Sequence, residues 1–329
     1  MNGQKILITG GSGFIGTHFI NSIQNKNIEV INVDIALPKN RQHELFWSNC
    51  NILDLDKLTK IFSQFQPTHV LHLAARATTV GKSLDDFVDN TVGTENVLIA
   101  IKGTPCVSHA VIASTQHVRK PGSGLAINDI DFAPHGIYGE SKVITEKLTR
   151  QANLNCTWTI IRPTTVWGPL HPYLPNGLWR YMKKGWYFHP KNDPVIRGYG
   201  YVKNVVWQIE QILNAPADLV NGKVFYIGEE TIKQIEWINA FSNALANRDV
   251  RTIPKEWIHL LAYIGDILKS MGLHFPMDGD RYFNLTTTNP VPMGPIIEAF
   301  GRPPYSIEKG IQETVDWLNS QTDQSLQGG

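Results

Sequence analysis

Two hydrophobic periods alternate through the first half of the chain. Short apolar runs predict buried strands of a parallel sheet, and they fall at 5–9, 29–34, 69–73, 111–113 and 158–161. Segments with helical spacing lie between them, near 15–25, 55–65, 86–103 and 138–153. Strands that alternate with helices predict an α/β fold, a doubly wound parallel Rossmann sheet with right-handed crossovers.

The amino-acid composition of the chain changes after about residue 165. Prolines and aromatic residues become more frequent, and eight of the nine tryptophans lie beyond residue 150. We expect a Rossmann domain over 1–165 and a smaller C-terminal substrate lobe over 166–329, some of whose segments return to the sheet. One helical face in 257–271 carries Trp257, Leu260, Leu261, Ile264, Ile267, Leu268 and Met271. This predicts an amphipathic helix that packs on its own lobe rather than on a membrane.

Composition and charge narrow the range of partners. The chain has 329 residues, of which 42% are hydrophobic and 18% charged, as in ordinary globular enzymes. A net charge of +1 gives no electrostatic basis for binding nucleic acid. Cys50, Cys106 and Cys156 are widely spaced, so we expect reduced thiols and no metal site. With no signal peptide before the first strand and no membrane-spanning apolar run, the expectation is a cytoplasmic protein.

The first predicted strand runs into a glycine-rich turn, Thr9-Gly-Gly-Ser-Gly-Phe-Ile-Gly16, that opens a helix pattern. Gly10 permits the tight turn, Gly13 lets the backbone approach a pyrophosphate, and Gly16 lets helix and strand pack closely. This is the pattern of a dinucleotide-binding site.

An acidic residue follows at the end of the second predicted strand. Asp34 can take the adenosine ribose hydroxyls, as NAD requires and a 2′-phosphate would oppose. The expected cofactor is NAD, with NADH preferred, while Lys39 and Arg41 leave NADPH open.

Together with the glycine turn, Tyr138-Gly-Glu-Ser-Lys142 gives the chain a resemblance to the extended short-chain dehydrogenase/reductases. The resemblance is to the branch of nucleotide-sugar epimerases, dehydratases and reductases, and it covers nearly the whole chain. Further segments match in order, namely His72-Leu-Ala-Ala75, Asn90 to Leu98, Ser114-Thr115, Arg162 to Pro169, Arg197 to Val202 and Pro304 to Trp317. It implies a nucleotide-diphosphate sugar as partner, a role in polysaccharide biosynthesis, and a homodimer that pairs the helices near 90–103 and 138–153.

The resemblance assigns the catalytic group to Thr115, Tyr138 and Lys142. Hydride transfer between a carbinol carbon and nicotinamide also moves the hydroxyl proton, and Tyr138 is the candidate acid and base. A free phenol has a pKa near about 10, and the charge of Lys142 at i+4, with that of nicotinamide, would lower it. Thr115 would donate a hydrogen bond to the same substrate oxygen.

The resemblance also implies a set of cofactor contacts. They are Gly10, Gly13, Phe14, Ile15, Asp34, Asn51, Ile52, Leu73, Ala74, Ala75, Tyr138, Lys142 and Pro163. In this set Asn51 and Ile52 stand where the family frames the adenine with an acid and an aliphatic residue.

The chain departs from the family at the substrate end of the pattern. Family dehydratases follow the Thr with an Asp-Glu pair that eliminates water, and here Gln116 and His117 stand there. Gln116 cannot protonate a leaving hydroxyl, so dehydration is not expected. For His117, which titrates near neutral pH, a hydrogen-bonding or space-filling role is favoured over action at C5. Thr165 replaces the Asn that helps hold the substrate diphosphate.

Further substrate contacts follow from the same resemblance. Arg197 and Arg281 match positions where the family grips a diphosphate with guanidinium groups. Asn176 and Leu178 lie in the loop that matches the one meeting the nucleotide.

Two reactions need only Tyr138, Lys142, Thr115 and nicotinamide. Net reduction of a 4-keto-6-deoxyhexose nucleotide is the favoured expectation, because the pocket residues depart from the usual epimerase pattern. The alternative is 4-epimerisation with retained NAD. A 3β-hydroxysteroid-type dehydrogenase shares the scaffold, and Arg197 and Arg281 argue against it.

Overall fold

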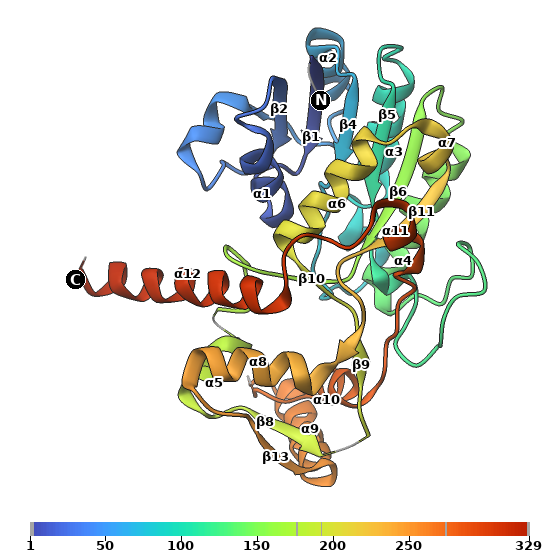
Figure 1. Cartoon of the computed structure of the whole chain (residues 1–329). Helices are drawn as coiled ribbons and strands as arrows, with labels where there is room; N and C mark the ends of the chain where they lie inside the picture. The colour runs from blue at the N-terminus through green and yellow to red at the C-terminus, as the bar shows by residue number, and fades with distance from the viewer. Residues whose placement is uncertain (1–2, 176, 192, 274, 328–329) are drawn as a thin grey trace.

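A seven-stranded parallel sheet forms the centre of the protein, described by a computed structural model for residues 3–175, 177–191, 193–273 and 275–327 (Figure 1). Its strands lie in the order β11 (Lys223–Ile227), β6 (Thr157–Pro163), β5 (His109–Ala113), β4 (His69–His72), β1 (Gln4–Thr9), β2 (Ile28–Asp34) and β3 (Trp47–Asn49). Every neighbouring pair in this sheet is parallel. The predicted doubly wound Rossmann sheet is confirmed.

Helices cover both faces of the sheet because successive strand residues point to opposite sides. Ile6 and Ile8 pack against α1 (Phe14–Ile23), α6 (Val202–Asn214) and α11 (Gly294–Phe300). Leu7 packs in a second core with α2 (Leu55–Phe65), α3 (Val92–Lys102) and α4 (Gly136–Gln151). Both cores consist of side chains with almost no exposure to solvent.

One predicted helix is shorter in the structure. The pattern near 86–103 contains a separate 3-10 turn, Leu84–Phe87, before α3 begins at Val92. Ser83 and Asp86 form a reciprocal capping box at the N-terminus of that turn, which fixes where it begins. Two other 3-10 turns span Arg41–Phe46 and Gln116–Val118.

A smaller lobe lies beyond the carboxyl ends of the strands (Figure 1). It holds α5 (Leu178–Lys184), α8 (Gln234–Ala246), α9 (Lys255–Ser270) and α10 (Gly279–Thr286). Three two-stranded pairs complete it, β7 (Thr165–Trp167) with β10 (Tyr199–Tyr201), β9 (Ile196–Arg197) with β12 (Ile232–Lys233), and β8 (Phe188–Lys191) with β13 (Arg251–Pro254). Its core is aromatic, and the rings of Tyr199 and Trp237 stack with centroids 4.3 Å apart.

The chain returns to the sheet after its first entry into the small lobe. Beyond β10, α6 covers the sheet and β11 adds its edge strand beside β6, with the short α7 (Ala217–Val220) between them. The last helix, α12 (Ile307–Gln327), contributes Ile311 and Val315 to the small-lobe core. Within the described residues, no helix combines the length and hydropathy needed to cross a membrane.

Candidate active site

The turn between β1 and α1 requires glycine at two of its positions. Gly10 has φ of 76°, and a Cβ there would lie 2.6 Å from the Ala74 backbone nitrogen. A Cβ on Gly16 would lie 2.5 Å from the Gly10 carbonyl oxygen, so α1 can approach the strand only with glycine there. A Cβ on Gly13 would meet only the Gly10 oxygen, at 3.1 Å. The turn therefore presents bare backbone at the N-terminus of α1, where anions bind well.

Asp34 is held at the end of β2 by the same turn. Its carboxylate accepts hydrogen bonds from the Ser12 amide at 3.0 Å and from the Ala36 amide at 2.9 Å. Both contacts fix the carboxylate beside the glycine turn, with the orientation set by backbone rather than by flexible side chains.

One cavity of about 680 Å³ runs from the glycine turn to the start of α4. This volume lies in the range of ordinary ligand sites. Every residue predicted for the cofactor lines it, namely Gly10, Gly13, Phe14, Ile15, Asp34, Asn51, Ile52, Leu73, Ala74, Ala75, Tyr138, Lys142 and Pro163. The same cavity is lined by Thr115, Gln116, His117 and Thr165. A dinucleotide fits this lining, because bare glycine backbone could receive a pyrophosphate and the Asp34 carboxylate could accept ribose hydroxyls.

The predicted catalytic group is part of the lining of this cavity. Tyr138 and Lys142 lie one turn apart on α4, and the Thr115 side chain hydrogen-bonds the phenol. Burial raises the pKa of Tyr138, and the Thr115 bond lowers it by less. Lys142 is 1% exposed, and burial lowers its pKa to about 8 although Glu146 opposes the shift. The lowering of the phenol pKa expected from Lys142 together with the nicotinamide charge stays a prediction, because in the protein alone burial sets the direction of the shift.

A buried polar network supports α4 from behind. Glu146, one turn beyond Lys142, accepts hydrogen bonds from Arg162 and from the Ser114 hydroxyl, the latter at 2.6 Å. Arg162 also donates to the Asp129 carbonyl at 2.6 Å. The network joins the ends of β5 and β6 to the helix that carries Tyr138.

A second buried contact fixes the start of the same helix. Asn90 accepts from the Arg76 amide at 2.8 Å and donates to the Ser141 hydroxyl at 2.9 Å. Asn90 is fully buried, so its amide holds α4 against the loop that follows β4.

Gln116 and Thr165 bond to each other at the substrate end. The Gln116 amide donates to the Thr165 hydroxyl at 3.0 Å, and its oxygen accepts from Asn289 at 3.4 Å. Asn289 comes from the segment after α10, so this contact joins the two lobes. These two hydrogen bonds hold the Gln116 side chain in place, and its amide provides no acidic group in the cavity.

His117 lies between Tyr138 and the small lobe. Its ring stands edge-on to Tyr138 at 6.0 Å and stacks on His135 at 5.8 Å, which in turn stacks on Phe283 at 5.9 Å. Burial lowers the pKa of His117 to about 4, so the ring is neutral at physiological pH. Its Nδ1 is buried and has no hydrogen-bond partner in the described part of the chain.

Arg197 is a buried cation near this ring stack. It is 8% exposed, and its Nη2 donates a hydrogen bond to the Asn284 carbonyl. Its Nε is buried without a partner, and no ion pair to a carboxylate joins it among the described residues. Burial lowers the pKa of Arg197. A buried guanidinium without a counter-ion favours an anionic ligand.

Like Arg197, Arg281 and Leu178 are not among the residues that line the cavity. Arg281 is exposed on α10 and donates to the Pro276 carbonyl, away from the cavity lining. Leu178 packs partly buried against the aromatic core of the small lobe. Asn176 lies outside the described residues.

Sequence reasoning did not single out several residues that build the site. Glu146 and Arg162 are among them, although the spacing Tyr138, Lys142, Glu146 continues one helical face and could have signalled the first. Asn289 lies far from Gln116 in the sequence, and no sequence pattern indicated that it would reach the site. His171 also lines the cavity, with its ring 5.1 Å from that of Phe14 in the glycine turn.

Comparison with known proteins adds to this geometry. A sequence model described as the NAD dependent epimerase/dehydratase family matches residues 6–228. The bifunctional UDP-glucose 4-epimerase and UDP-xylose 4-epimerase 1 of Pisum sativum is 28% identical over 165 residues, 45% of this chain and 47% of that protein. The UDP-N-acetyl-alpha-D-glucosaminuronate decarboxylase of Bacillus cytotoxicus is 28% identical over 260 residues, 71% of this chain and 77% of that protein.

Solved structures share the whole fold. The UDP-glucose 4-epimerase of Thermotoga maritima, solved with UDP-glucose, aligns with a TM-score of 0.74 at 21% identity, over 97% of this chain and 99% of that one. That likeness concerns the fold alone. The matched region spans about half the length of several curated relatives, among them the Pisum sativum enzyme.

Proposed function

Because the chain belongs to the NAD dependent epimerase/dehydratase family, we propose that it transfers hydride reversibly at C4 of a nucleotide-linked sugar. One observation carries the proposal. The cavity that begins at the glycine turn and Asp34 ends at Thr115, Tyr138 and Lys142. A dinucleotide along that lining and an alcohol at Tyr138 would therefore share one cavity.

In the proposed reaction Tyr138 exchanges the hydroxyl proton of the substrate. Its phenol, hydrogen-bonded to Thr115, would take the proton when the alcohol is oxidised and return it when the ketone is reduced. Lys142 would stabilise the phenolate through its charge. Bound NAD would supply the acceptor and donor of hydride.

We propose NAD rather than NADP as the cofactor. The Asp34 carboxylate is already fixed by the Ser12 and Ala36 amides. It can accept the ribose hydroxyls of NAD, and it would repel a 2′-phosphate. Neighbouring structures of this fold include a Thermus thermophilus UDP-glucose 4-epimerase in complex with NAD.

The unpaired guanidinium of Arg197 supports a nucleoside diphosphate as the anchor of the substrate. A diphosphate is the kind of anion that a buried arginine binds in a two-pronged geometry. The same buried cation argues against a steroid substrate, which carries no anionic group to pair with it.

For the net reaction, 4-epimerisation is the proposal that the relatives support best. Several of them are named as 4-epimerases. Dehydration is disfavoured because Gln116, bonded to Thr165 and Asn289, brings no acid to the cavity. Net reduction of a 4-keto-6-deoxyhexose nucleotide is the second candidate, and the neutral, unusual pair Gln116 and His117 favours it.

One experiment separates the two candidates. The protein is incubated with UDP-hexoses, and separately with nucleotide 4-keto-6-deoxy sugars plus NADH or NADPH, while the absorbance of reduced nicotinamide is followed. Epimerisation gives a new 4-epimer without net loss of NADH. Stoichiometric loss of NADH with a keto sugar assigns the reductase, and no product in either arm contradicts both.

We also propose a homodimer through α3 and α4. Val92 and Ile99 of α3 are large apolar side chains that are 47% and 46% exposed. A second copy would cover them, and analytical ultracentrifugation measures whether it does.

A further inference from the structure

Helix α9 is attached to the small lobe by a narrow face. Only Ile258, Ala262 and Gly265 are buried along its 16 residues. Gly265 allows the contact, since a Cβ there would lie 1.7 Å from the Met277 carbonyl oxygen. The helix lies with this face against α10, the segment before it, and the β8–β13 pair.

The opposite face of α9 is apolar and open to solvent. At 100° per residue, Trp257, Leu260, Leu261, Ile264, Ile267 and Met271 fall in one continuous arc. Trp257 is 61% exposed, Ile264 39% and Met271 69%. Leu273 continues the surface just past the helix at 55% exposure, and Tyr263 borders it at 64%. The expectation that this face packs on its own lobe is wrong, because the small-lobe core is closed without it.

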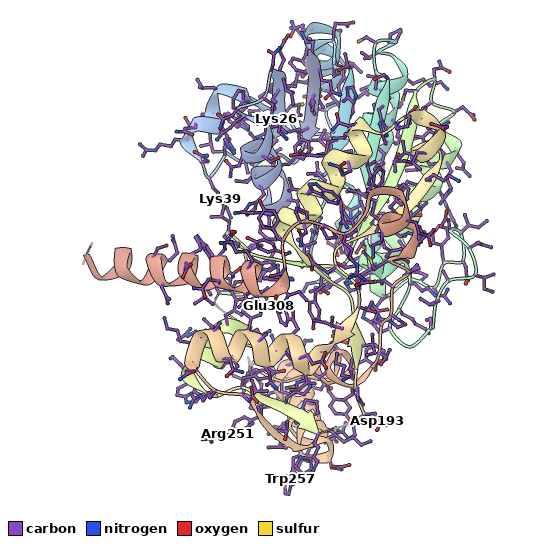
Figure 2. All side chains as sticks on the ribbon, viewed as in Figure 1. Lys26, Lys39, Asp193, Arg251, Trp257 and Glu308 are labelled. Atoms are coloured by element: carbon purple, nitrogen blue, oxygen red, sulfur yellow. The ribbon has the colours of Figure 1, made fainter. Side chains whose placement is uncertain are left out.

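This apolar arc lies at the end of the molecule farthest from the sheet. In Figure 1, α9 is at the bottom, beyond α8 and remote from α3 and α4. Figure 2 shows Trp257 pointing outward at that same end. A flat surface could therefore contact the arc without touching the Rossmann domain. The helices of the proposed dimer, α3 and α4, would remain accessible.

We propose that this arc rests in the surface of a lipid bilayer. None of its members is charged or carries an amide, whereas the rim of a protein interface supplies about one hydrogen bond per 100–200 Å². Trp257 and Tyr263 have amphipathic rings of the kind enriched at the membrane–water interface. A helix with such a face lies in the plane of the interface, with its apolar side among the acyl chains.

The size of the arc argues against a second copy as its partner. At about 1.5 Å per residue, α9 is roughly 24 Å long and about 10 Å wide. Pairing through this face alone would bury well under the roughly 1,200–2,000 Å² of a stable interface. Insertion into a bilayer requires no such complementary area.

Positive and negative side chains near the arc balance one another, so electrostatic attraction to lipid should contribute little to binding. Lys269 pairs with Asp278 at 3.2 Å and Asp280 at 3.9 Å, and Lys255 is followed by Glu256. Attraction to anionic lipid is therefore small, and the apolar side chains supply the affinity. Binding should depend little on salt or on the charge of the lipid.

The test is co-sedimentation of the whole chain with vesicles of phosphatidylcholine, alone or mixed with phosphatidylglycerol. The wild type should bind both to a similar extent, at low and at high salt. Ile264→Asp, at the centre of the arc, should lower the partition coefficient at least about tenfold. Ser270→Asp adds the same charge to the same helix outside the arc and should bind like the wild type. Unchanged thermal midpoints show that both variants fold.

Three results would overturn the proposal. The wild type could fail to bind either vesicle, or Ile264→Asp could bind as well as Ser270→Asp. The third is a concentration-dependent dimer, measured by ultracentrifugation, that Ile264→Asp dissociates while vesicles bind nothing. None of these results depends on the proposed reaction, because the assay measures no turnover.

Discussion

Glu146 and Arg162 form a two-pronged buried ion pair, with Nε to Oε1 and Nη2 to Oε2 both 2.8 Å apart. Glu146 is fully buried and Arg162 is 2% exposed. The pair lies one helical turn from Lys142, and it opposes through Glu146 the effect of burial on the pKa of that lysine. The helix that carries Tyr138 and Lys142 is thus tied to β6 by charge as well as by packing.

Breaking this pair should destabilise the fold strongly. Glu146→Gln leaves the Arg162 guanidinium buried without a counter-charge, which costs about 3–5 kcal/mol. The free energy of unfolding in urea measures the loss. Glu236→Gln, in the exposed pair with Lys233, is the control and should change little. Equal effects from the two variants would contradict the importance given to the buried pair.

Removing the phenol oxygen should separate chemistry from binding. Tyr138→Phe keeps the ring but cannot exchange a proton, so kcat should fall by about 10²–10⁴-fold. Dinucleotide affinity, measured by calorimetry, should stay close to that of the wild type. Tyr263→Phe, on exposed α9, serves as the matched control. Near-normal turnover in Tyr138→Phe would exclude it as the acid and base.

Asp34 should set the choice between dinucleotides. Asp34→Ala removes the acceptor for the ribose hydroxyls and the charge that opposes a 2′-phosphate, so the ratio of NAD to NADP affinity should fall. Glu29→Ala changes an acid on the same strand that pairs with Lys5 at the surface, and it should leave the ratio unchanged. An unaltered ratio in Asp34→Ala would remove Asp34 from the ribose site.

His117 should act on the substrate and not on the cofactor. Its buried, unpartnered Nδ1 in the described structure would bond a substrate hydroxyl. Losing such a bond costs about 1–3 kcal/mol, or roughly 5–150-fold in kcat/KM. His117→Ala should show this loss with normal dinucleotide affinity, and His117→Asn should recover part of it. A variant with unchanged kcat/KM would leave the ring a packing role.

Stability should fall as the pH drops from about 6.5 towards 4. Burial lowers the pKa of eight histidines, and it does so to about 3 for His72 and to about 4 for His109, His117, His171 and His189. In this window the unfolded chain binds more protons than the folded one, so protonation favours unfolding. Each such histidine adds a slope of about 1.4 kcal/mol per pH unit.

The carboxyl group of Glu229 has the opposite effect on the free energy of unfolding within the same pH range. Burial raises the pKa of Glu229 to about 7, so its contribution to stability is lost as the pH rises through that value. The histidines outnumber it, and the net slope remains positive. Urea unfolding between neutral pH and pH 5 measures the slope, and a flat profile would show that these rings do not stay neutral in the folded protein.

The sequence pattern predicted the features that depend on residues close together in the chain. The strands at 5–9 and 29–34, the glycine turn and the Tyr138–Lys142 spacing depend on neighbours in sequence, and each was readable as such. The cofactor residues that line the cavity were implied by the family resemblance, and parallel strands bring them together because their carboxyl ends meet at one edge of the sheet.

Features that depend on distant contacts could not be predicted. Nothing near Gln116 in sequence indicates Asn289, which reaches it from the other lobe. The apolar face of α9 has the periodicity of a packed helix, and only the position of the helix on the lobe shows that Ile258 and Ala262 are buried instead. The matched positions Arg197 and Arg281 looked alike in sequence, yet one is buried and the other exposed.

The most direct test of the central claim follows the hydrogen at C4. A UDP-hexose deuterated at C4 is incubated with the protein and NAD, and the products are analysed by NMR and mass spectrometry. The proposal predicts a 4-epimer that retains deuterium at C4, formed by the wild type and not by Tyr138→Phe. An epimer whose C4 deuterium is replaced by solvent hydrogen would contradict hydride transfer at this site.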